Sequence, residues 1–443
     1  MKPSFFTVLF LACSLTLPAG AQSPVNLTLA ESLLRAQKNN ESLLIAEQDL
    51  ETARFRILES LADGLPQLDA GLAYDRNWLL PNFVFGNQSV TIGAHNNLSG
   101  KLGFRQSLYS GGKLFASVRV ARLYRQYAHE NIRLIQQRVH SAAESAFYDL
   151  LYARDLVALS KLSLIRAQAN QDQVLRLFES GRVSEYDLLR AQTQVAEIRP
   201  DSIRASNQFA LAALALKNAL GLDSETNIEI TGNFRSESPV VGGSEREHIA
   251  RGLLFRPEIR QQAALIAMRK NAETVTRSGG RPKLELVVNG QWEAQKDNFG
   301  FTGQDFHQSW FSGLSLDVPL FDGFRTRAQV SQARIDTRRA ELELRQTERA
   351  IRLEIARAHQ VLEESLAQEQ AQGQVQILAL RGLKIAETRY LDGIGTQLEV
   401  IDGQLTVQRA EASLARARHD VAVAIVMLER SMGILGNDVD TNP

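Results

Sequence analysis

The chain has 443 residues, of which 44% are hydrophobic, 7% are aromatic and 23% are charged. Basic and acidic residues balance at 50 each, so net charge gives no reason to expect a nucleic-acid partner. Because aromatic residues are sparse and Ala, Leu and Arg are abundant, the composition favours long helices over an all-β fold.

The first 21 residues have the pattern of a secretory signal peptide. Lys2 is basic, residues 5–17 are apolar, and Ala19-Gly20-Ala21 predicts cleavage after Ala21. The single cysteine, Cys13, lies inside this segment, where "FLAC" leaves open a lipidated Cys13. No later apolar run reaches the roughly 18 residues of a transmembrane helix. The sequence therefore predicts an exported chain without a helical membrane span.

The remainder of the chain is an internal duplication. "QSLYSGGKLFASVRVAR" matches "DVPLFDGFRTRAQVSQAR" at an offset of 212 positions, which persists from Tyr109 and Phe321 to Gly221 and Gly433. Earlier residues match at an offset of 216, so the difference of four lies between Pro66 and Tyr109. We expect a first repeat at 22–234, a linker at 235–244, a second repeat at 245–433 and a tail at 434–443.

Each repeat is predicted to hold one very long helix. Residues 113–180 contain neither Gly nor Pro, and their apolar residues recur in steps of three and four. A helix of this length spans roughly 100 Å. A helix at about 184–220 follows, and Ser184 with Asp187 predicts a capping box at its start. The counterparts are 326–391 and 396–432, with Thr396 and Glu399 at the cap, and shorter helices at 28–62 and 260–278 precede the hairpins.

A β-hairpin is predicted between the helices of each repeat, at about 67–109 and 283–320. Apolar residues alternate with polar ones along each strand. Alternation over about ten residues is typical of transmembrane β-barrels, although an ordinary half-buried sheet alternates too. The chain's three tryptophans lie on the apolar face and suit a membrane interface: Trp78, Trp292 and Trp310. The opposite face is expected to line a lumen and carries charged residues: Asp69, Lys101, Arg105, Glu285 and Asp317.

Four strands cannot close a barrel, because the smallest such barrels need about eight. Closure therefore requires several copies of the chain: two copies supply eight strands and three supply twelve. Only the larger ring is expected to leave an open lumen.

The order of helix, hairpin, long helix, tip and helix, duplicated, resembles the TolC-type outer-membrane efflux protein family. The resemblance covers residues 27–433 and rests on "LTLAESLLRAQKNN", "LPQL", "LYSGG" with "LFDG", and the tips "GRVSEYDLLRAQ" and "GIGTQLEVIDGQ". It implies a mainly α fold with a β-barrel part: a homotrimer whose 12-stranded outer-membrane barrel continues as a periplasmic helical tunnel. It also implies contact with outer-membrane lipid, a periplasmic adaptor and an inner-membrane pump of RND, ABC or MFS type.

The tips carry the residues that the resemblance marks as functional. Gly181, Gly393 and Gly395 are expected in the tip turns. The family's acidic pair at the periplasmic mouth matches Glu399 and Asp402, whereas the first repeat has Asp187 and Arg190 there. The family links its tips through an Asp, a Tyr and an Arg; Asp187 and Tyr390 match, but the Arg position holds Gly395. A purely structural interpretation of the two acids stays open, in which Glu399 only caps a helix and Asp402 only faces solvent.

The expected function is an exit duct of a tripartite efflux or type I secretion system in the outer membrane of a Gram-negative bacterium. The alternative is a non-channel periplasmic coiled-coil adaptor or scaffold. The seven histidines do not have the spacing of paired metal ligands, and no arrangement of residues resembles a nucleophilic catalytic site. Neither enzyme activity nor a metal or other cofactor is therefore expected.

Overall fold

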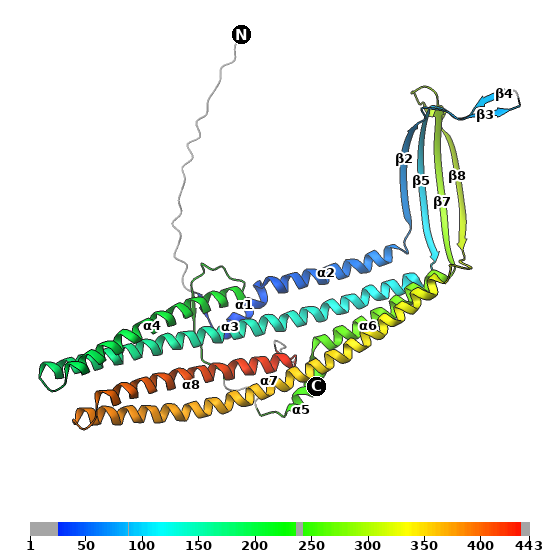
Figure 1. Cartoon of the computed structure of the whole chain (residues 1–443). Coiled ribbons are helices and arrows are strands. Elements are labelled where there is room, and N and C mark those ends of the chain that lie inside the picture. Colours follow the sequence, from blue (N-terminus) through cyan, green and yellow to red (C-terminus); the bar gives the residue numbers. More distant parts are fainter. Residues whose placement is uncertain (1–24, 87, 236–241, 436–443) are drawn as a thin grey trace, which may run out of the picture.

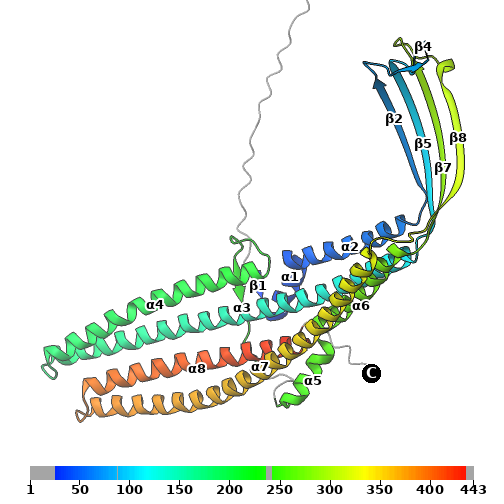
Figure 2. The ribbon, with the colours of Figure 1, turned by 45° about the vertical axis from the view of Figure 1, so that its right-hand side comes forward.

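The computed structural model describes residues 25–86, 88–235 and 242–435. The predicted signal peptide with Cys13, most of the linker and the end of the tail lie outside these residues. Long helices form a curved layer, and a four-stranded sheet rises from one end of it at a steep inclination (Figures 1 and 2). None of the helices in the described part of the chain is long and apolar enough to cross a membrane.

The described helices fall into two series of four. The first is α1 (Leu29–Asn39), α2 (Glu41–Ala62), α3 (Lys113–Glu179) and α4 (Glu185–Ala219). The second is α5 (Glu245–Phe255), α6 (Pro257–Arg277), α7 (Arg325–Leu391) and α8 (Gln397–Ser431), followed after α6 by the short 3₁₀ turn Ser278–Gly280. A second 3₁₀ turn spans Gly303–Asp305.

The duplication extends to the caps of the helices. Thr28 begins α1 in a capping box with Glu31, and Ser244 begins α5 in the same way with Glu247. These pairs are 216 positions apart, whereas α3 and α7 begin 212 positions apart.

The helical segment that precedes the hairpin is divided into two helices in each repeat, a break that the sequence analysis does not predict. The single helix expected at 28–62 is broken at Asn40, which closes α1 and whose side chain caps α2 by accepting from Ser42 N at 3.0 Å. The equivalent break in the second repeat is at Arg256, with Pro257 as the first residue of α6. The helix expected to begin at Arg260 therefore starts three residues earlier, and α5 precedes it.

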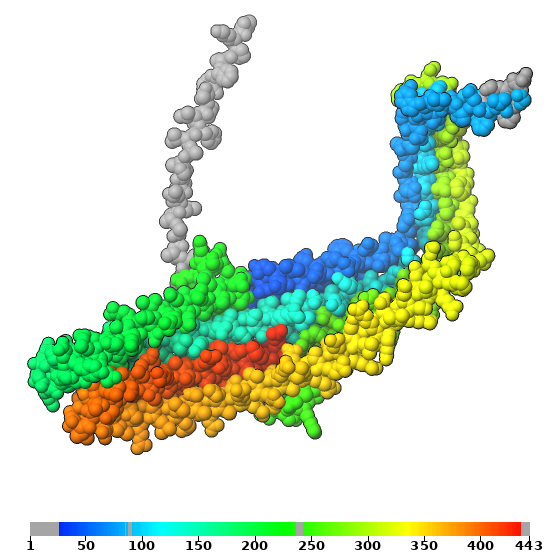
Figure 3. Space-filling model, viewed as in Figure 1, coloured from blue at the N-terminus to red at the C-terminus, as the bar shows by residue number. Residues whose placement is uncertain are grey.

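The helices lie side by side in one layer (Figure 3). Near the sheet the order is α2, α3, α6, α7, and toward the far end it is α4, α3, α8, α7. Thus α2 and α4 follow one another along one side of α3, while α6 and α8 fill the space between α3 and α7. The seam between the repeats runs along α3 and is bridged by Arg166, whose guanidinium makes two hydrogen bonds to Glu411 of α8 at 3.1 and 3.3 Å.

The largest hydrophobic core lies midway along the helices, where α1, α3, α4 and α8 meet. Phe147 and Tyr148 are fully buried there, together with Leu216 and Val426 from the two shorter helices. Two short strands, β1 (Val25–Leu27) and β6 (Ile228–Ile230), pair in parallel beside it. This core joins the start and end of the first repeat to the last helix of the second.

The main sheet joins the hairpins of both repeats. Its order is β2 (Gln67–Arg76), β5 (Asn96–Tyr109), β7 (Lys283–Lys296) and β8 (His307–Asp317), all antiparallel. A separate hairpin of β3 (Asn82–Phe85) and β4 (Gln88–Thr91) leaves the end of the sheet far from the helices (Figure 1). The outer strands β2 and β8 each have one edge without a partner strand among the described residues.

Candidate functional site at the helical tips

Both helical hairpins end at the same extremity of the molecule, opposite the sheet (Figures 1 and 2). Gly181 and Gly393 follow the long helices with φ of 70° and 75°, a left-handed backbone that suits glycine. In both turns an amide donates to the carbonyl five residues earlier: Arg182 to Leu177 at 2.9 Å and Ile394 to Arg389 at 3.0 Å. The chain therefore reverses at equivalent positions in the two repeats.

Asp187 forms its hydrogen bonds with Ser184, at the start of its own helix α4. Its backbone N–H donates to Ser184 Oγ at 3.2 Å, and its carboxylate accepts from the Ser184 N–H at 3.2 Å and hydroxyl at 2.7 Å. The capping box expected at this tip is present. No hydrogen bond between Asp187 and Tyr390 is present among the described residues.

Glu399 at the second tip behaves differently from Asp187. Its N–H donates to Thr396 Oγ1 at 3.3 Å, but its carboxylate does not close the box with the Thr396 N–H. Instead Glu399 Oε2 lies 3.3 Å from Arg389 Nε, and Arg389 Nη2 donates to Ile394 O at 3.3 Å. Arg389 thus folds back over the turn and offsets the charge of one acid, a contact that the sequence reasoning missed.

Asp402 lies three residues beyond Glu399 on α8. Its side chain is exposed and has no ion-pair partner within the described part of the chain. Of the two acids predicted at the mouth, only Asp402 therefore has an uncompensated charge in a single copy.

Gly395 is required by close packing rather than by its backbone angle. A Cβ at this position would lie 2.9 Å from Arg389 Cβ and 3.0 Å from the Tyr390 backbone nitrogen. Backbone cannot move aside as a flexible side chain can, so this turn excludes the Arg that the family pattern has at this position.

Tyr390 is half-buried, and its hydroxyl is buried without a hydrogen-bond partner among the described residues. Burial raises the pKa of this phenol, and the negative charge of Asp187 raises it further. The side chain borders a cavity of about 320 Å³ between α3, α7 and α8. The structure therefore brings Tyr390 near Asp187, while Glu399 pairs with Arg389.

The charged residues predicted to line a lumen all share one face of the main sheet. Gln67 pairs with Arg105, Lys101 with Gln291 and Lys283 with Asp317, and residues opposite each other in an antiparallel pair point to the same face. Asp69, opposite Gly103, and Glu285, opposite Ser107, have the same parity.

Two of the three tryptophans lie on the opposite face of the sheet. Trp292 is paired with Gly100 and Trp310 with Gly290, and the two rings meet edge to face with centroids 5.3 Å apart. Trp78 differs from expectation, because β2 ends at Arg76 and Trp78 follows it. The Arg76 guanidinium lies 4.7 Å from the Trp78 ring centre. Arg76 occupies a position in the strand where the alternation would place an apolar residue, and the aromatic ring gives its charge a partner.

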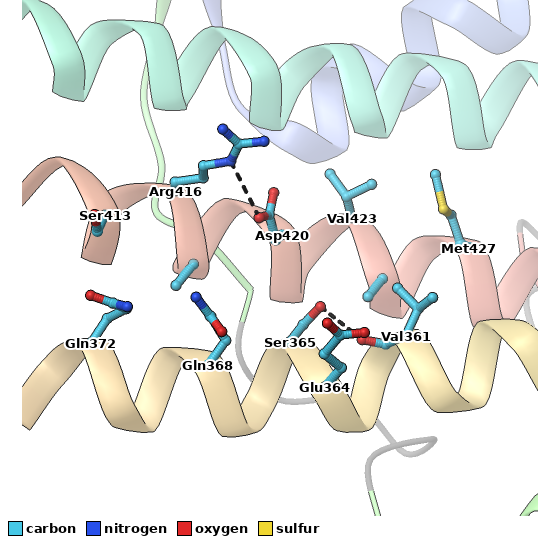
Figure 4. Close-up of a pocket in the computed structure, with 12 residues that line it drawn as sticks. Val361, Glu364, Ser365, Gln368, Gln372, Ser413, Arg416, Asp420, Val423 and Met427 are labelled. Carbon is cyan, nitrogen blue, oxygen red and sulfur yellow. Dashed lines mark hydrogen bonds and ion pairs between the residues drawn. The ribbon is translucent and has the colours of Figure 1, made fainter.

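A shallow groove of about 510 Å³ lies between α7 and α8 (Figure 4). Gln368 and Gln372 border it on α7, and Arg416 lies 3.7 Å from Asp420 on α8. Arg416 and Asp420 offset one another in charge, and Glu364 also borders the groove. The described residues hold no cluster of three or more His, Cys, Asp or Glu side chains that could bind a metal.

Comparison with known proteins agrees with the fold and the duplication. The model of the outer membrane efflux protein family matches twice, at residues 33–222 and 250–434. The outer membrane protein TolC of Escherichia coli is 22% identical over 429 residues, covering 93% of this chain and 84% of that protein. Protein CyaE of Bordetella pertussis is 25% identical over 329 residues, covering 74% and 68%. A crystal structure of a membrane protein from Pseudomonas aeruginosa matches with a TM-score of 0.77 at 22% identity, covering 91% and 93%.

The chain therefore belongs to the outer membrane efflux protein family. It is an outer-membrane channel with a large periplasmic helical part, of the kind that serves tripartite efflux and secretion systems. Channels of this family act with adaptor and inner-membrane pump partners, and the alternative of a periplasmic adaptor or scaffold is not favoured.

Proposed function

We propose that three copies of the chain close into one exit duct, with a twelve-stranded barrel in the outer membrane and a helical tunnel below it. The open edges of β2 and β8 support this assembly. β2 and β8 run in opposite directions, so β8 of one copy can continue the antiparallel order with β2 of the next. An unprotected edge strand is a site for pairing with another chain.

The two faces of the sheet support a lumen on one side and lipid on the other. The face with Asp69, Lys101, Arg105, Glu285 and Asp317 would line the duct. The other face exposes large apolar side chains in the single chain, among them Leu72 at 87% and Leu314 at 67%. Such a surface suits outer-membrane lipid, with Trp292 and Trp310 toward the interface.

The second tip would form the selectivity gate of the periplasmic mouth. Three copies would bring three Asp402 carboxylates around one axis and favour cations. Glu399 would contribute less, because Arg389 of the same chain offsets its charge. Asp187 and Tyr390 would act with them as gate residues, in a mouth without the Arg that Gly395 replaces.

The tips also suit contact with partner proteins. Tyr186 and Leu189 on the first tip, and Leu391 and Ile394 on the second, are more than half exposed. Exposed apolar residues at the end of a helical hairpin mark an interaction site. We expect a periplasmic adaptor here, connected to an inner-membrane pump of RND, ABC or MFS type. Export through the duct requires no enzymatic chemistry, cofactor or nucleic acid in this proposal.

The assembly is tested by purifying the chain from membranes in detergent. Light scattering should give the mass of three copies, and incorporation into planar bilayers should give discrete conductance steps. A matched variant with Leu72→Pro on the edge strand β2 should lose both, because proline removes an edge donor. A wild-type monomer that gives no conductance would reject the proposal.

A further inference from the structure

The loop between β8 and α7 contains a strained backbone. Phe324 has φ of 63°, and within the part of the chain that the structure describes it is the one residue other than glycine with a left-handed backbone. The equivalent position of the first repeat, 212 residues earlier, is Gly112, with φ of 89°. Glycine adopts this backbone without strain, whereas phenylalanine does not. The second repeat therefore carries a strain that the first repeat avoids, which points to a use for the side chain.

The side chain of Phe324 is largely exposed in the single chain. The residue is 64% exposed, and its ring meets the Phe321 ring edge to face with centroids 5.4 Å apart. Phe321 and Leu320 are more exposed still, at 76% and 93%. Neighbouring exposed apolar side chains are typical of a surface that another molecule covers. We call Leu320, Phe321 and Phe324 the junction cluster.

The junction cluster lies at one edge of the chain. It belongs to the loop that joins β8, an outer strand of the sheet, to α7, an outer helix of the layer (Figure 1). Residues 63–66 join α2 to β2, which are the outer elements of the opposite edge. Both loops lie at the end of the sheet nearest to the helices (Figure 2). When β8 of one copy pairs with β2 of the next, the junction cluster therefore comes beside residues 63–66 of the next copy.

The edge formed by α2 is apolar as well. Leu65, in the loop after α2, is more than half exposed, and so are Phe55 and Leu58 on the helix. The buried residues Ala46 and Ala53 lie about half a turn away from Phe55 around the helix axis. Phe55 and Leu58 therefore point away from the rest of their own chain.

The edge formed by α7 has the same character. Ile335 and Leu342 are at least half exposed, whereas the buried residues Thr337 and Ala340 lie on the opposite side of the helix. Eleven residues, or about three helical turns, separate Phe324 from Ile335, so the exposed apolar side of α7 continues the junction cluster.

The two edges are also complementary in charge. The 22 residues of α2 hold five acidic side chains and two arginines, a net charge of −3. The first 22 residues of α7, 325–346, hold six arginines and three acidic side chains, a net charge of +3. Opposite charges favour α2 of one copy beside α7 of the next. An anionic lipid surface would attract α7 but repel α2, so a second copy of the chain suits both edges better.

We propose that the junction cluster is a contact between copies of this chain, in which the ring of Phe324 packs against Leu65 and the end of α2 of the next copy. The proposal rests on the proposed function, because the order of the copies follows from the pairing of β8 with β2. The strain at Phe324 is offset in the assembled ring by apolar burial that a single chain cannot provide. Three such contacts hold the copies together where the barrel continues as the tunnel.

Cysteine cross-linking tests the contact. The single cysteine, Cys13, lies in the predicted signal peptide, so after its cleavage the introduced cysteines are the only thiols. In membranes, Leu65→Cys with Phe324→Cys should give covalent dimers and trimers on a denaturing gel after treatment with a short bis-maleimide. Leu65→Cys with Phe115→Cys is the matched control and should give neither. Phe115 is an exposed aromatic residue at the start of α3, inside the layer rather than at its edge.

Phe324→Gly tests the role of the ring separately. Glycine relieves the strain, so circular dichroism should show a chain at least as stable as the wild type. The trimer should nevertheless dissociate more readily, with a dissociation constant raised about ten-fold for each contact, because the buried aromatic surface is lost. Light scattering on dilution in detergent measures this constant, and Phe115→Ala should dissociate as the wild type does.

Two results would overturn the inference. A conducting trimer in which Leu65→Cys with Phe324→Cys gives no cross-link would mean that Phe324 faces lipid or the lumen. Unchanged dissociation of the Phe324→Gly trimer would mean that the ring does not hold the copies together. In both cases the conducting trimer leaves the exit duct intact, so failure here is distinct from failure of the proposed function.

Discussion

The guanidinium of Arg389 lies 3.3 Å from the carboxylate of Glu399, across the turn that joins α7 to α8. Both side chains are about half exposed, at 48% and 41%, so the pair adds little to stability. Its consequence is electrostatic: the mouth of the proposed duct presents one uncompensated acid per chain instead of two.

Removing Arg389 should make the channel more selective for cations. Arg389→Ala frees Glu399, and a unit charge at about 4 Å in water is worth up to ~1 kcal/mol, so the permeability ratio should rise roughly two- to five-fold. The reversal potential under a salt gradient measures this ratio. Adding Glu399→Gln to Arg389→Ala should cancel most of the rise, and independent effects of the two changes would show that the pair is not coupled.

The two acids of the mouth should differ in effect when neutralised singly. Asp402→Asn removes an uncompensated charge and should lower cation selectivity clearly. Glu399→Gln removes a charge that Arg389 already offsets and should lower it less. The same reversal-potential measurement compares them at low salt, where screening is weakest. Equal losses would mean that Arg389 does not shield Glu399, and no loss in either variant would remove both residues from the gate.

Three glycines with left-handed backbone should differ in their tolerance of alanine. Gly181, Gly221 and Gly433 have φ of 70°, 63° and 74°. A Cβ at Gly181 meets nothing within 4 Å, whereas one at Gly221 would lie 2.6 Å from Asn39 O and one at Gly433 3.0 Å from the Arg256 backbone.

Gly181→Ala should therefore cost only the backbone term of about 1–2 kcal/mol, while the other two add a clash of about 1–3 kcal/mol. Melting of the helical signal by circular dichroism ranks the three variants. A similar loss in all three would contradict the packing of α4 and α8 against the helix breaks.

The length of α3 was predictable because its sequence contains no helix-breaking residue. Residues 113–180 lack Gly and Pro, and α3 spans Lys113–Glu179. The break at Asn40 was missed because Asn is a weaker stop signal than its counterpart, the Arg256–Pro257 step in the second repeat. Comparing the repeats position by position there would have located both breaks.

The strand faces followed from alternation, but the tip contacts did not follow from any local pattern. Trp78 is predicted to lie in the strand because it continues the alternation of apolar residues along β2. The strand instead ends at Arg76. The pairing of Arg389 with Glu399 spans ten positions and depends on how tightly the turn closes. Asn170 and Tyr390 border one cavity from different repeats, and sequence periodicity does not predict this neighbourhood.

The seam between the repeats should also give the helical tunnel a pH-dependent stability. His419 of α8 has both ring nitrogens beside carboxylates: Nε2 is 2.7 Å from Asp149 of α3, and Nδ1 is 2.9 Å from Asp420. Tyr152 packs against the ring, and Arg416 lies 3.7 Å from Asp420.

Burial opposes the charged imidazole, but the hydrogen bonds to Asp149 and Asp420 outweigh it, so the pKa of His419 is raised above its usual value near 6.5. A raised pKa in the folded state means that the bridge stabilises the fold fully below pH 6.5 and is lost as pH rises through the folded-state pKa. Since the carboxylates are about half exposed, the contribution should be modest, about 1 kcal/mol.

His419→Gln should therefore lower the melting midpoint of the tunnel helices more at pH 5.5 than at pH 8.5. Asp149→Asn should show the same pH dependence, because it removes the partner across the seam while leaving Asp420. His129→Gln, at a histidine outside this cluster, serves as the control and should show no such dependence. A midpoint difference of the same size at both pH values would mean that folding does not shift the pKa of His419 and that its bridge to Asp149 adds no pH-dependent stability to the seam.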